Sequence, residues 1–542
     1  MKKSKKAMAP AVMIVVLAMV AAGCGSNEKK DQSTSSSNTP SATESAAKAN
    51  VKPVELNISW MDIKNGFDDV NAKNDTIFND VQKKFNITVN PVQITWNDWQ
   101  EKAKVWAASG QLPDIFPNLI AVDNTGLYAS WAKQGVIKAL PDDLSKYPNI
   151  AKIMKLPSVQ PLKVDGKFYM IPRMTFNDSS DWSSARPILY RKDWAAQAGF
   201  TSEPKSFDEL VAMTKAVQKQ HPGIAGIAIS NKDYLQTIFL SSFPELSNGK
   251  SWTNDGGKWI PSFASPKAYG GVKQLRQLYS DGLLDKDFAI QKERDGENKF
   301  YNGQAFISLG GGFNLAPNVD TFKKANPGVK LADAVGFMNY IPAADGNRYT
   351  FVETPYWSET YFSNKLDDAK FERVLQVMDY MLTDEYDALV VNGIQGVDYK
   401  IEGDKSISLL KSDETLQKKY PITVGMGVLA SWRGAFGAAG KAVINSNPDV
   451  AAWLDYSKET FDKFKKEDKP APVNFDIMLM STPAKDKLGA FYSGAKDDLI
   501  KVMLGKDDPV KMWQDAIKSY DAKGLPEAIA EVNAKAKEMG IK

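Results

Sequence analysis

The chain has 542 residues, of which 43% are hydrophobic and 25% charged, a composition typical of a globular protein large enough for more than one core. Its formal charge of +3 becomes −1 without residues 1–23, which hold four lysines and no acid, so a basic surface for nucleic acid is excluded. The single cysteine and single histidine exclude disulfides within the chain and multi-histidine metal sites.

The N-terminus carries the pattern of a secretion signal. Lysines at positions 2, 3, 5 and 6 precede an apolar run at 7–22, which is shorter than the ~20 residues of a spanning helix. We therefore predict a signal peptide over residues 1–23. Cys24 directly behind the cut resembles the lipidated residue of a bacterial lipoprotein, whose acyl chains hold it at the extracellular face of the cell membrane. The alternative is an ordinary secreted protein with a leftover thiol.

A tether and an α/β body follow. Residues 24–52 are rich in Ser, Thr, Asn, Ala and Lys, which predicts a flexible tether. The predicted elements after it are a strand at 54–58, a helix at 75–85, a strand at 87–94, a helix from a cap at Asn97 to Ala108, and a strand that starts at 112–116. This order predicts parallel pairing, with ligands bound beyond the carboxyl ends of the strands.

Caps and turn residues also mark strands and helices later in the chain. They are a strand at 167–171, a helix opened by the capping box of Ser206 and Glu209, an amphipathic helix at 371–382, and helices from 484 onward with a break at Gly505. A strand at 422–424 before Gly425 and Gly427 would mimic a dinucleotide fingerprint, but it lies far from the first strand–helix–strand unit, which disfavours a nucleotide site.

Several segments together carry a resemblance to a known family. The motifs are Ala108–Ile115, Asp165–Pro172, Tyr190–Trp194 with Pro204 and Phe207–Leu210, Phe300–Ala305, and Gly393–Tyr399. In this order they are similar to family 1 extracellular solute-binding proteins, the sugar-binding components of ABC importers, in the lipoprotein branch of Gram-positive bacteria. The resemblance implies an α/β periplasmic-binding-protein-like fold of class II, with two lobes, a multi-crossing hinge and a ligand cleft between the lobes. It implies lobe 1 at 53–171 with about 350–410, and lobe 2 at 172–349 with about 411–542.

The same resemblance implies a function. It describes a monomeric, non-catalytic receptor without a cofactor, which captures an oligosaccharide and delivers it to ABC permease subunits. Many members of this branch carry a calcium loop after the helix that here ends near Gln220, but residues 220–226 lack a ladder of carboxylates, so we predict no metal site. His221 is interpreted as a surface histidine. Two alternatives stay open: a surface polysaccharide-degrading enzyme, because two carboxylates suffice for a glycosidase, and a receptor for a non-sugar solute such as a peptide.

Aromatic and planar polar side chains are the candidate sugar ligands. Apolar ring faces of a sugar stack on Trp or Tyr, and its hydroxyls bond to planar polar groups. The positions that face the cleft in the resembling fold are Trp60, Asp62, Asn118, Phe313, Asn314, Trp432 and Arg433, with Trp252, Tyr356, Trp357 and Gln395 as further candidates. For each aromatic residue the alternative is packing within a lobe. The core is predicted to hold Trp99, Trp106, Trp194, Trp453 and Trp513.

Overall fold

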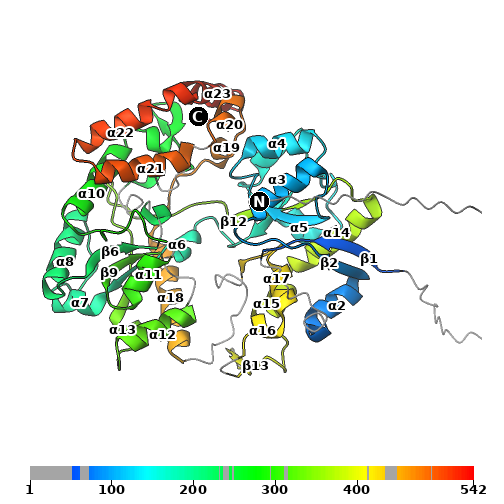
Figure 1. Ribbon diagram of the computed structural model, residues 1–542, viewed down its shortest axis with the longest axis horizontal. Coiled ribbons are helices and arrows are strands. Elements are labelled where there is room, and N and C mark those ends of the chain that lie inside the picture. Colours follow the sequence, from blue (N-terminus) through cyan, green and yellow to red (C-terminus); the bar gives the residue numbers. More distant parts are fainter. Residues whose placement is uncertain are drawn as a thin grey trace, which may run out of the picture. The chain divides into compact units, whose positions relative to one another are not determined.

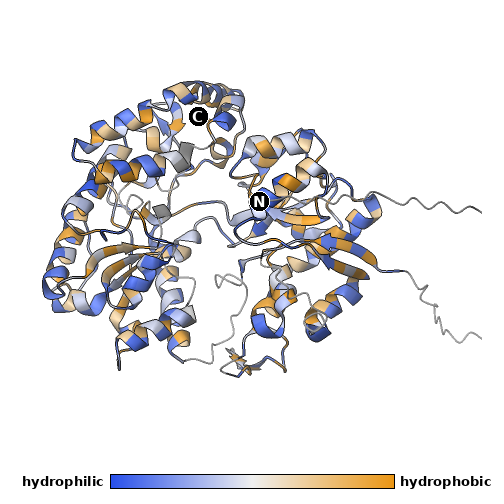
Figure 2. Ribbon diagram, viewed as in Figure 1, coloured by the Kyte–Doolittle hydropathy of each residue, from blue (hydrophilic) through white to orange (hydrophobic). Residues whose placement is uncertain are grey.

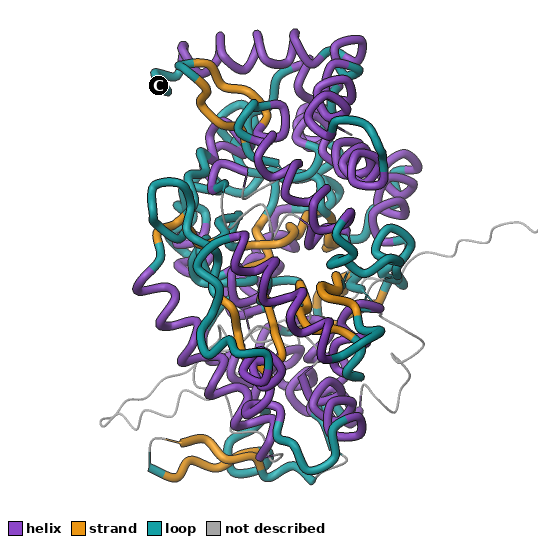
Figure 3. Tube along the Cα trace, turned by 90° about the vertical axis from the view of Figure 1, so that its left-hand side faces the viewer, coloured by secondary structure: helices purple, strands orange, loops and turns teal. Residues whose placement is uncertain are grey.

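Two β-sheets with separate hydrophobic cores organise the chain. The computed structural model describes residues 52–61, 73–230, 232–235, 243–246, 250–292, 294–310, 315–403, 405–411, 414–433, 448–489 and 491–542. Helices hold far more residues of this part than strands do, and the strands form short groups between them (Figure 3). None of the helices described is long and apolar enough to cross a membrane.

The first sheet has five strands in the order β2-β1-β3-β12-β4. Figure 1 labels β1, β2 and β12 of this sheet. The strands are β1 (Val54–Ile58), β2 (Ile87–Pro91), β3 (Ile115–Asn118), β4 (Ile171–Met174) and β12 (Tyr356–Phe362). Strand β1 is parallel to β2 and β3, which confirms the predicted parallel start, whereas β12 runs antiparallel to β3 and β4. Parallel strands joined by helices place the carboxyl ends of β1, β2 and β3 at one edge.

Helices on this sheet complete the first core. They are α2 (Thr76–Phe85), α3 (Trp99–Ser109), α4 (Thr125–Lys133), α5 (Pro148–Ile153), α14 (Asp368–Met381), α15 (Asp384–Asn392) and α17 (Pro421–Gly427), with the 3₁₀ turn Gln160–Leu162. The short helix α16 (Leu416–Lys419) has no buried residue and lies beside α15 and α17. The hairpin β13 (Tyr399–Glu402) and β14 (Lys405–Ser408) lies between α15 and α16 in the chain. Asp75 caps α2 by accepting a hydrogen bond from the amide of Phe78 at 2.9 Å, which satisfies an otherwise free helix donor.

The second sheet has four strands in the order β10-β5-β9-β6. They are β5 (Ile188–Arg191), β6 (Ala225–Ile229), β9 (Ala305–Leu309) and β10 (Val335–Met338). Alternate residues of β5 enter different cores: Ile188 and Tyr190 pack on one face, and Leu189 packs on the other. Both faces are therefore covered, as expected for strands with continuous apolar sequences. Along the helices hydrophobic and hydrophilic residues alternate, which is the amphipathic pattern of a covering layer (Figure 2).

Two groups of helices cover the second sheet. The elements of this half are α6 (Trp182–Ala185), α7 (Lys192–Gln197), α8 (Phe207–Gln220), α10 (Ala268–Ser280), α11 (Asp295–Tyr301), α12 (Leu315–Ala325), α13 (Leu331–Ala334), α18 (Pro448–Glu467), α21 (Phe491–Leu504), α22 (Pro509–Lys518), the hairpin β7 (Trp252–Asp255) and β8 (Lys258–Pro261), and the pair β11 (Tyr349–Thr350) and β15 (Lys469–Pro470). Helices α8, α10, α21 and α22 pack on one face, and α11, α12, α13 and α18 on the other.

The chain passes between the two sheets several times. It does so after β4, before β12 and after α17. Ile422, Met426 and Leu429, from a segment that the sequence assigned to lobe 2, pack in the core of the first sheet. Near the C-terminus, α19 (Phe475–Met478) also joins that core, and α20 (Pro483–Lys487) reaches α4 through the hydrogen bond from Thr125 Oγ1 to Asp486 Oδ1 at 2.8 Å. Helix α23 (Leu525–Glu538) packs on α20.

Several predicted boundaries need correction. The residue at the N-cap position of α3 is Asp98 rather than Asn97. The Asp98 carboxylate makes no capping bond to the helix and instead accepts hydrogen bonds from the amide and hydroxyl of Thr95. The strand predicted at 167–171 begins at Ile171, because the turn at Asp165 and Gly166, both with positive φ, pairs Val164 with Lys167 in a tight hairpin. The segment 422–424 lies in helix α17 and not in a strand.

Candidate functional site

Four tryptophans gather at the carboxyl ends of β1 and β2. We call Trp96, Trp99, Trp357 and Trp432 the tryptophan cluster. Their ring centroids lie 5.9 Å apart for Trp96 and Trp357, 5.6 Å for Trp96 and Trp432, 5.5 Å for Trp99 and Trp357, and 6.1 Å for Trp357 and Trp432. Trp99 is buried, Trp357 and Trp432 are half-buried, and Trp96 is 41% exposed. The cluster therefore has a buried base and an aromatic surface open to solvent.

Local structure explains how Trp96 and Trp357 reach this place. Beyond β1 and β2 the two strands stay paired through a bridge between Met61 and Ile94, and the turn that Asp98 closes by accepting from the amide of Thr95 then presents Trp96. The hydrogen bonds from Thr95 lower the pKa of Asp98, so its carboxylate stays charged. Trp357 sits where the register of β12 against β4 shifts. Such a bulge turns a side chain out of the regular alternation of a strand.

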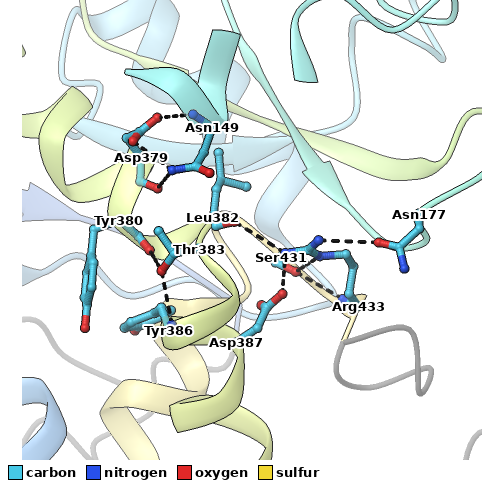
Figure 4. Close-up of polar contacts among 10 residues, drawn as sticks. All are labelled: Asn149, Asn177, Asp379, Tyr380, Leu382, Thr383, Tyr386, Asp387, Ser431 and Arg433. Atoms are coloured by element: carbon cyan, nitrogen blue, oxygen red, sulfur yellow. Dashed lines mark hydrogen bonds and ion pairs between the residues drawn. The ribbon is translucent and has the colours of Figure 1, made fainter. Parts of the chain in front are cut away.

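A short segment after α17 carries Trp432. Its amide donates to the carbonyl of Met174 at 2.6 Å, and the amide of Met174 donates to the carbonyl of Ala430 at 3.1 Å. The next residue, Arg433, forms an ion pair with Asp387 on α15 and donates to Asn177 Oδ1 and the carbonyl of Leu382, both at 3.4 Å (Figure 4). Trp432 is therefore fixed on both sides by contacts to separate parts of the chain.

Arg433 is thus bonded to protein groups on several sides. Its Nε and amide also bond to Ser431 Oγ at 3.2 Å, so its guanidinium has acceptors from three segments (Figure 4). Burial raises the pKa of Asp387, and the Arg433 charge opposes that rise. A partly buried ion pair of this kind anchors a loop. Arg433, a predicted sugar ligand, therefore joins the segment that carries Trp432 to α15 and to Asn177.

A fully buried arginine lies against the cluster. The Cζ atom of Arg173 is 5.5 Å from the ring centroid of Trp432 and 6.0 Å from that of Trp357. Burial lowers the pKa of Arg173 to about 9, so this side chain stays positively charged at neutral pH. A guanidinium against aromatic rings is an attractive contact, and it restricts how the rings can rotate.

The opposite face of the first sheet holds a buried carboxyl group. Glu359 is 0% exposed, and its Oε2 accepts a hydrogen bond from the hydroxyl of Tyr361 at 2.9 Å and from the amide of Ala121 at 3.4 Å. Burial raises the pKa of Glu359 to about 8, and so the group is mostly neutral at pH 7. Asn118, a predicted sugar ligand, lies opposite Glu359 in the ladder. It is 1% exposed and bonds to the amide of Leu119.

Three predicted aromatic ligands are core residues. Trp60 is 3% exposed and packs against α17, where a Cβ at Gly425 would lie 2.5 Å from its Nε1. Tyr356 is 1% exposed and donates its hydroxyl proton to the carbonyl of Ser158 at 2.7 Å. Trp252 is 2% exposed, in a small core between β7, α19 and α23. Stacking of a sugar on a side chain requires an open ring face, so these predictions are corrected.

The remaining predicted positions divide into two groups. Gln395 is exposed in the loop that leads into β13, and its backbone pairs with Tyr399. Cys24, Asp62, Phe313 and Asn314 lie outside the described residues. Sequence reasoning missed Trp96 and Arg173. The signal for Trp96 was its place in the polar turn Thr95–Asp98, where an aromatic residue has little to pack against.

The chemistry of the assembled site is that of binding. It offers aromatic faces, a buried cation and ordered backbone groups. Among the residues that the structure describes, no group of three or more His, Cys, Asp or Glu could hold a metal ion. The only histidine, His221, stacks on Trp194 with the ring centroids 4.2 Å apart, at the end of α8 in the second lobe.

Comparisons with known proteins agree with this architecture. A sequence model of the family described as bacterial extracellular solute-binding protein matches residues 76–397, more than half of the chain. The polygalacturonan/rhamnogalacturonan-binding protein YtcQ of Bacillus subtilis (strain 168) is 23% identical over 504 residues, which are 91% of this chain and 89% of YtcQ.

Solved structures extend the likeness to the fold. The alginate-binding protein AlgQ2, solved without calcium ion, matches with a TM-score of 0.63 at 19% identity, over 89% of this chain and 98% of its own. An HMO binding ABC-transporter associated solute binding protein from Bifidobacterium longum infantis ATCC 15697 matches with a TM-score of 0.63 at 16% identity, over 89% and 98%. The predicted α/β fold with two lobes and several crossings is confirmed.

Proposed function

Because this chain belongs to the bacterial extracellular solute-binding proteins, we propose that it captures an oligosaccharide and delivers it to the permease of an ABC importer. The observation that carries the proposal is the tryptophan cluster at the carboxyl edge of the first sheet, the edge at which open α/β sheets bind ligands. The names of the polygalacturonan/rhamnogalacturonan-binding protein YtcQ and the alginate-binding protein AlgQ2 support a carbohydrate ligand. We propose that the protein acts as a monomer and without catalysis.

A ligand panel tests the proposal. Oligogalacturonides, alginate oligosaccharides and neutral fructan oligosaccharides are titrated while tryptophan fluorescence and heat are recorded. We expect at least one sugar to bind with a fluorescence change, because stacking on the cluster alters the surroundings of Trp96, Trp357 and Trp432. Release of reducing ends from a polysaccharide would favour the degrading enzyme instead. Binding of peptides but of no sugar in the panel would favour the non-sugar receptor.

Membrane attachment through Cys24 is part of the proposal and has its own test. We expect Cys24→Ser to release the protein from the membrane fraction of the producing cell, while oligosaccharide affinity stays unchanged, because the change removes the acylated thiol and leaves the folded body intact. Fractionation and a high-salt wash measure this. A variant that stays in the washed membrane fraction would contradict the lipid anchor.

Oligosaccharide binding should also survive chelation. The ten residues after Gln220 contain no Asp or Glu, so they lack the oxygen ligands of a calcium loop. We expect the affinity and the melting temperature to be the same with and without excess EDTA, as measured by calorimetry and a thermal melt. A large loss of either quantity on chelation would show that a metal site exists elsewhere.

A further inference from the structure

Three segments that pass between the two sheets are bonded to one another. They are 174–176 from the last residue of β4, 354–357 into the start of β12, and 430–432 after α17, and we call them the crossing segments. The amides of Thr175 and Phe176 donate to the carbonyl of Pro355 at 2.9 and 3.0 Å. The bonds that join Met174 to Ala430 and Trp432 link the first segment to the third. These bonds tie together three of the places at which the chain passes between the two sheets.

Arg173 reaches all three crossing segments or the residues beside them. It belongs to β4 and directly precedes the first segment. Its Nη1 donates to Ser358 Oγ at 2.7 Å, next to the second segment, and its Nε donates to the carbonyl of Val428 at 2.6 Å, just before the third. These partners are 185 and 255 residues away in the chain. Arg173 is 0% exposed, so water cannot replace these acceptors readily.

The same guanidinium also faces the aromatic site. Trp357 and Trp432, the two half-buried rings of the cluster, are the last residues of the second and third crossing segments, and both lie near this guanidinium. An apolar side chain would fill this space at a lower desolvation cost, but it could not donate in two fixed directions. The arrangement therefore provides orientation at the expense of burying a charge.

We propose that Arg173 is a positioning residue for ligand binding, which ties the crossing segments together and holds Trp357 and Trp432 at the angle that stacks a sugar. The inference rests on the proposed function for its binding readout. It goes beyond that function because it assigns the link between lobe movement and the aromatic surface to one buried side chain. Arg173 acts through these two rings and does not itself contact the ligand.

Two arginine variants and a matched control test the inference. Arg173→Met keeps the length of the side chain and removes its donors, and Arg173→Lys keeps the charge but loses the planar fork. The control is Arg191→Met. Arg191 is also a buried strand arginine and stacks on a tryptophan, with its Cζ atom 4.0 Å from the ring centroid of Trp194, but it lies in the second sheet.

Hydrogen exchange followed by mass spectrometry gives the first readout, and it needs no ligand. We expect Arg173→Met to speed exchange about tenfold in peptides that contain 174–176 and 430–432, with an intermediate effect for Arg173→Lys. Peptides of the second sheet should exchange as in the wild type. Arg191→Met should give the opposite pattern. If Arg173→Met raised the exchange rates of peptides from both sheets equally, Arg173 would have a general stabilising role, and the inference would be overturned.

Binding and closure give the second readout. With the best-binding oligosaccharide of the panel above, we expect Arg173→Met to lower affinity at least tenfold and to reduce the ligand-induced compaction seen by small-angle scattering. Wild-type affinity and compaction in this variant would overturn the inference. If Arg173→Met fails to fold, Ser358→Ala decides, because it removes only one acceptor of the guanidinium. We expect it to lower affinity about threefold, and no loss would count against Arg173.

Failure of the proposed function is distinguishable from failure of this inference. If the wild type binds no sugar in the panel, the function is wrong, whereas the exchange pattern still decides whether Arg173 ties the crossing segments together. If the wild type binds sugar and Arg173→Met exchanges and binds like it, only the inference is wrong.

Discussion

Replacing Trp432 by alanine should lower the affinity for the bound oligosaccharide about 5- to 150-fold while changing the melting temperature little. Stacking of a ring on an aromatic face contributes roughly 1–3 kcal/mol, judged from nucleic-acid platforms. Trp432 is half-buried, so the truncation removes a binding surface without opening a large cavity. Calorimetry measures the affinity, and a thermal melt measures the stability. Trp357→Ala should change affinity in the same direction, because its ring lies 6.1 Å from that of Trp432.

Trp60→Ala is the matched control for this prediction. Trp60 is 3% exposed and belongs to the first core, where truncation of a tryptophan costs about 3–5 kcal/mol of folding free energy. The melting temperature of Trp60→Ala should therefore fall sharply, while the protein that stays folded keeps its affinity. If Trp432→Ala instead lost stability and kept its affinity, the tryptophan cluster would serve only to pack the protein, and the oligosaccharide would bind elsewhere.

Trp60 shows which features a local sequence pattern can predict and which it cannot. Leu56, Ile58 and Trp60 share one face of β1, because side chains of a strand alternate. The alternation of apolar residues predicts the strand. Continued to position 60, the same alternation places the Trp60 side chain on the buried face. The prediction that the ring of Trp60 is open to a ligand rested instead on its position at the end of the strand. The helix that covers this face, α17, comes more than 360 residues later in the chain, and Gly425 leaves the space that Trp60 fills.

The first strands and helices were predictable because their signals are local. A period of two, a capping aspartate and turn residues lie within a few positions of one another, and β1, α2 and β2 begin within one residue of the predicted positions. The tryptophan cluster draws on three separate parts of the chain. Its formation depends on a bulge in β12 and on the bonds between Met174 and Trp432, neither of which has a local sequence signature.

Arg173 illustrates the same limit for charge. In the sequence it follows a proline at the end of a predicted strand, which usually indicates a solvated residue. Its acceptors, Ser358 and the carbonyl of Val428, become neighbours only when the crossing segments come together. A single sequence gives no means to pair such residues.

Replacing Glu359 by glutamine should raise the stability of the protein at pH 7 by up to about 3 kcal/mol. Burial raises the pKa of Glu359 to about 8, against about 4.5 in the unfolded chain. Between these values the folded protein binds a proton that the unfolded chain does not, so the free energy of unfolding falls as the pH rises through this window. Two charges also act on Glu359: Asp123 raises its pKa further, and Lys250 lowers it.

Glutamine keeps the shape of Glu359 and cannot ionise, so it can still accept the hydrogen bonds from Tyr361 and Ala121. Urea unfolding at pH 4.5, 6, 7 and 8 provides the test. The two proteins should be nearly equal at pH 4.5, and the variant should lose less stability toward pH 8. Glu297→Gln is the control, because that buried glutamate pairs with Arg294 at 3.3 Å, and its loss should destabilise the protein. An unchanged pH slope in Glu359→Gln would mean that Glu359 is ionised in the folded protein, with its charge stabilised by Lys250.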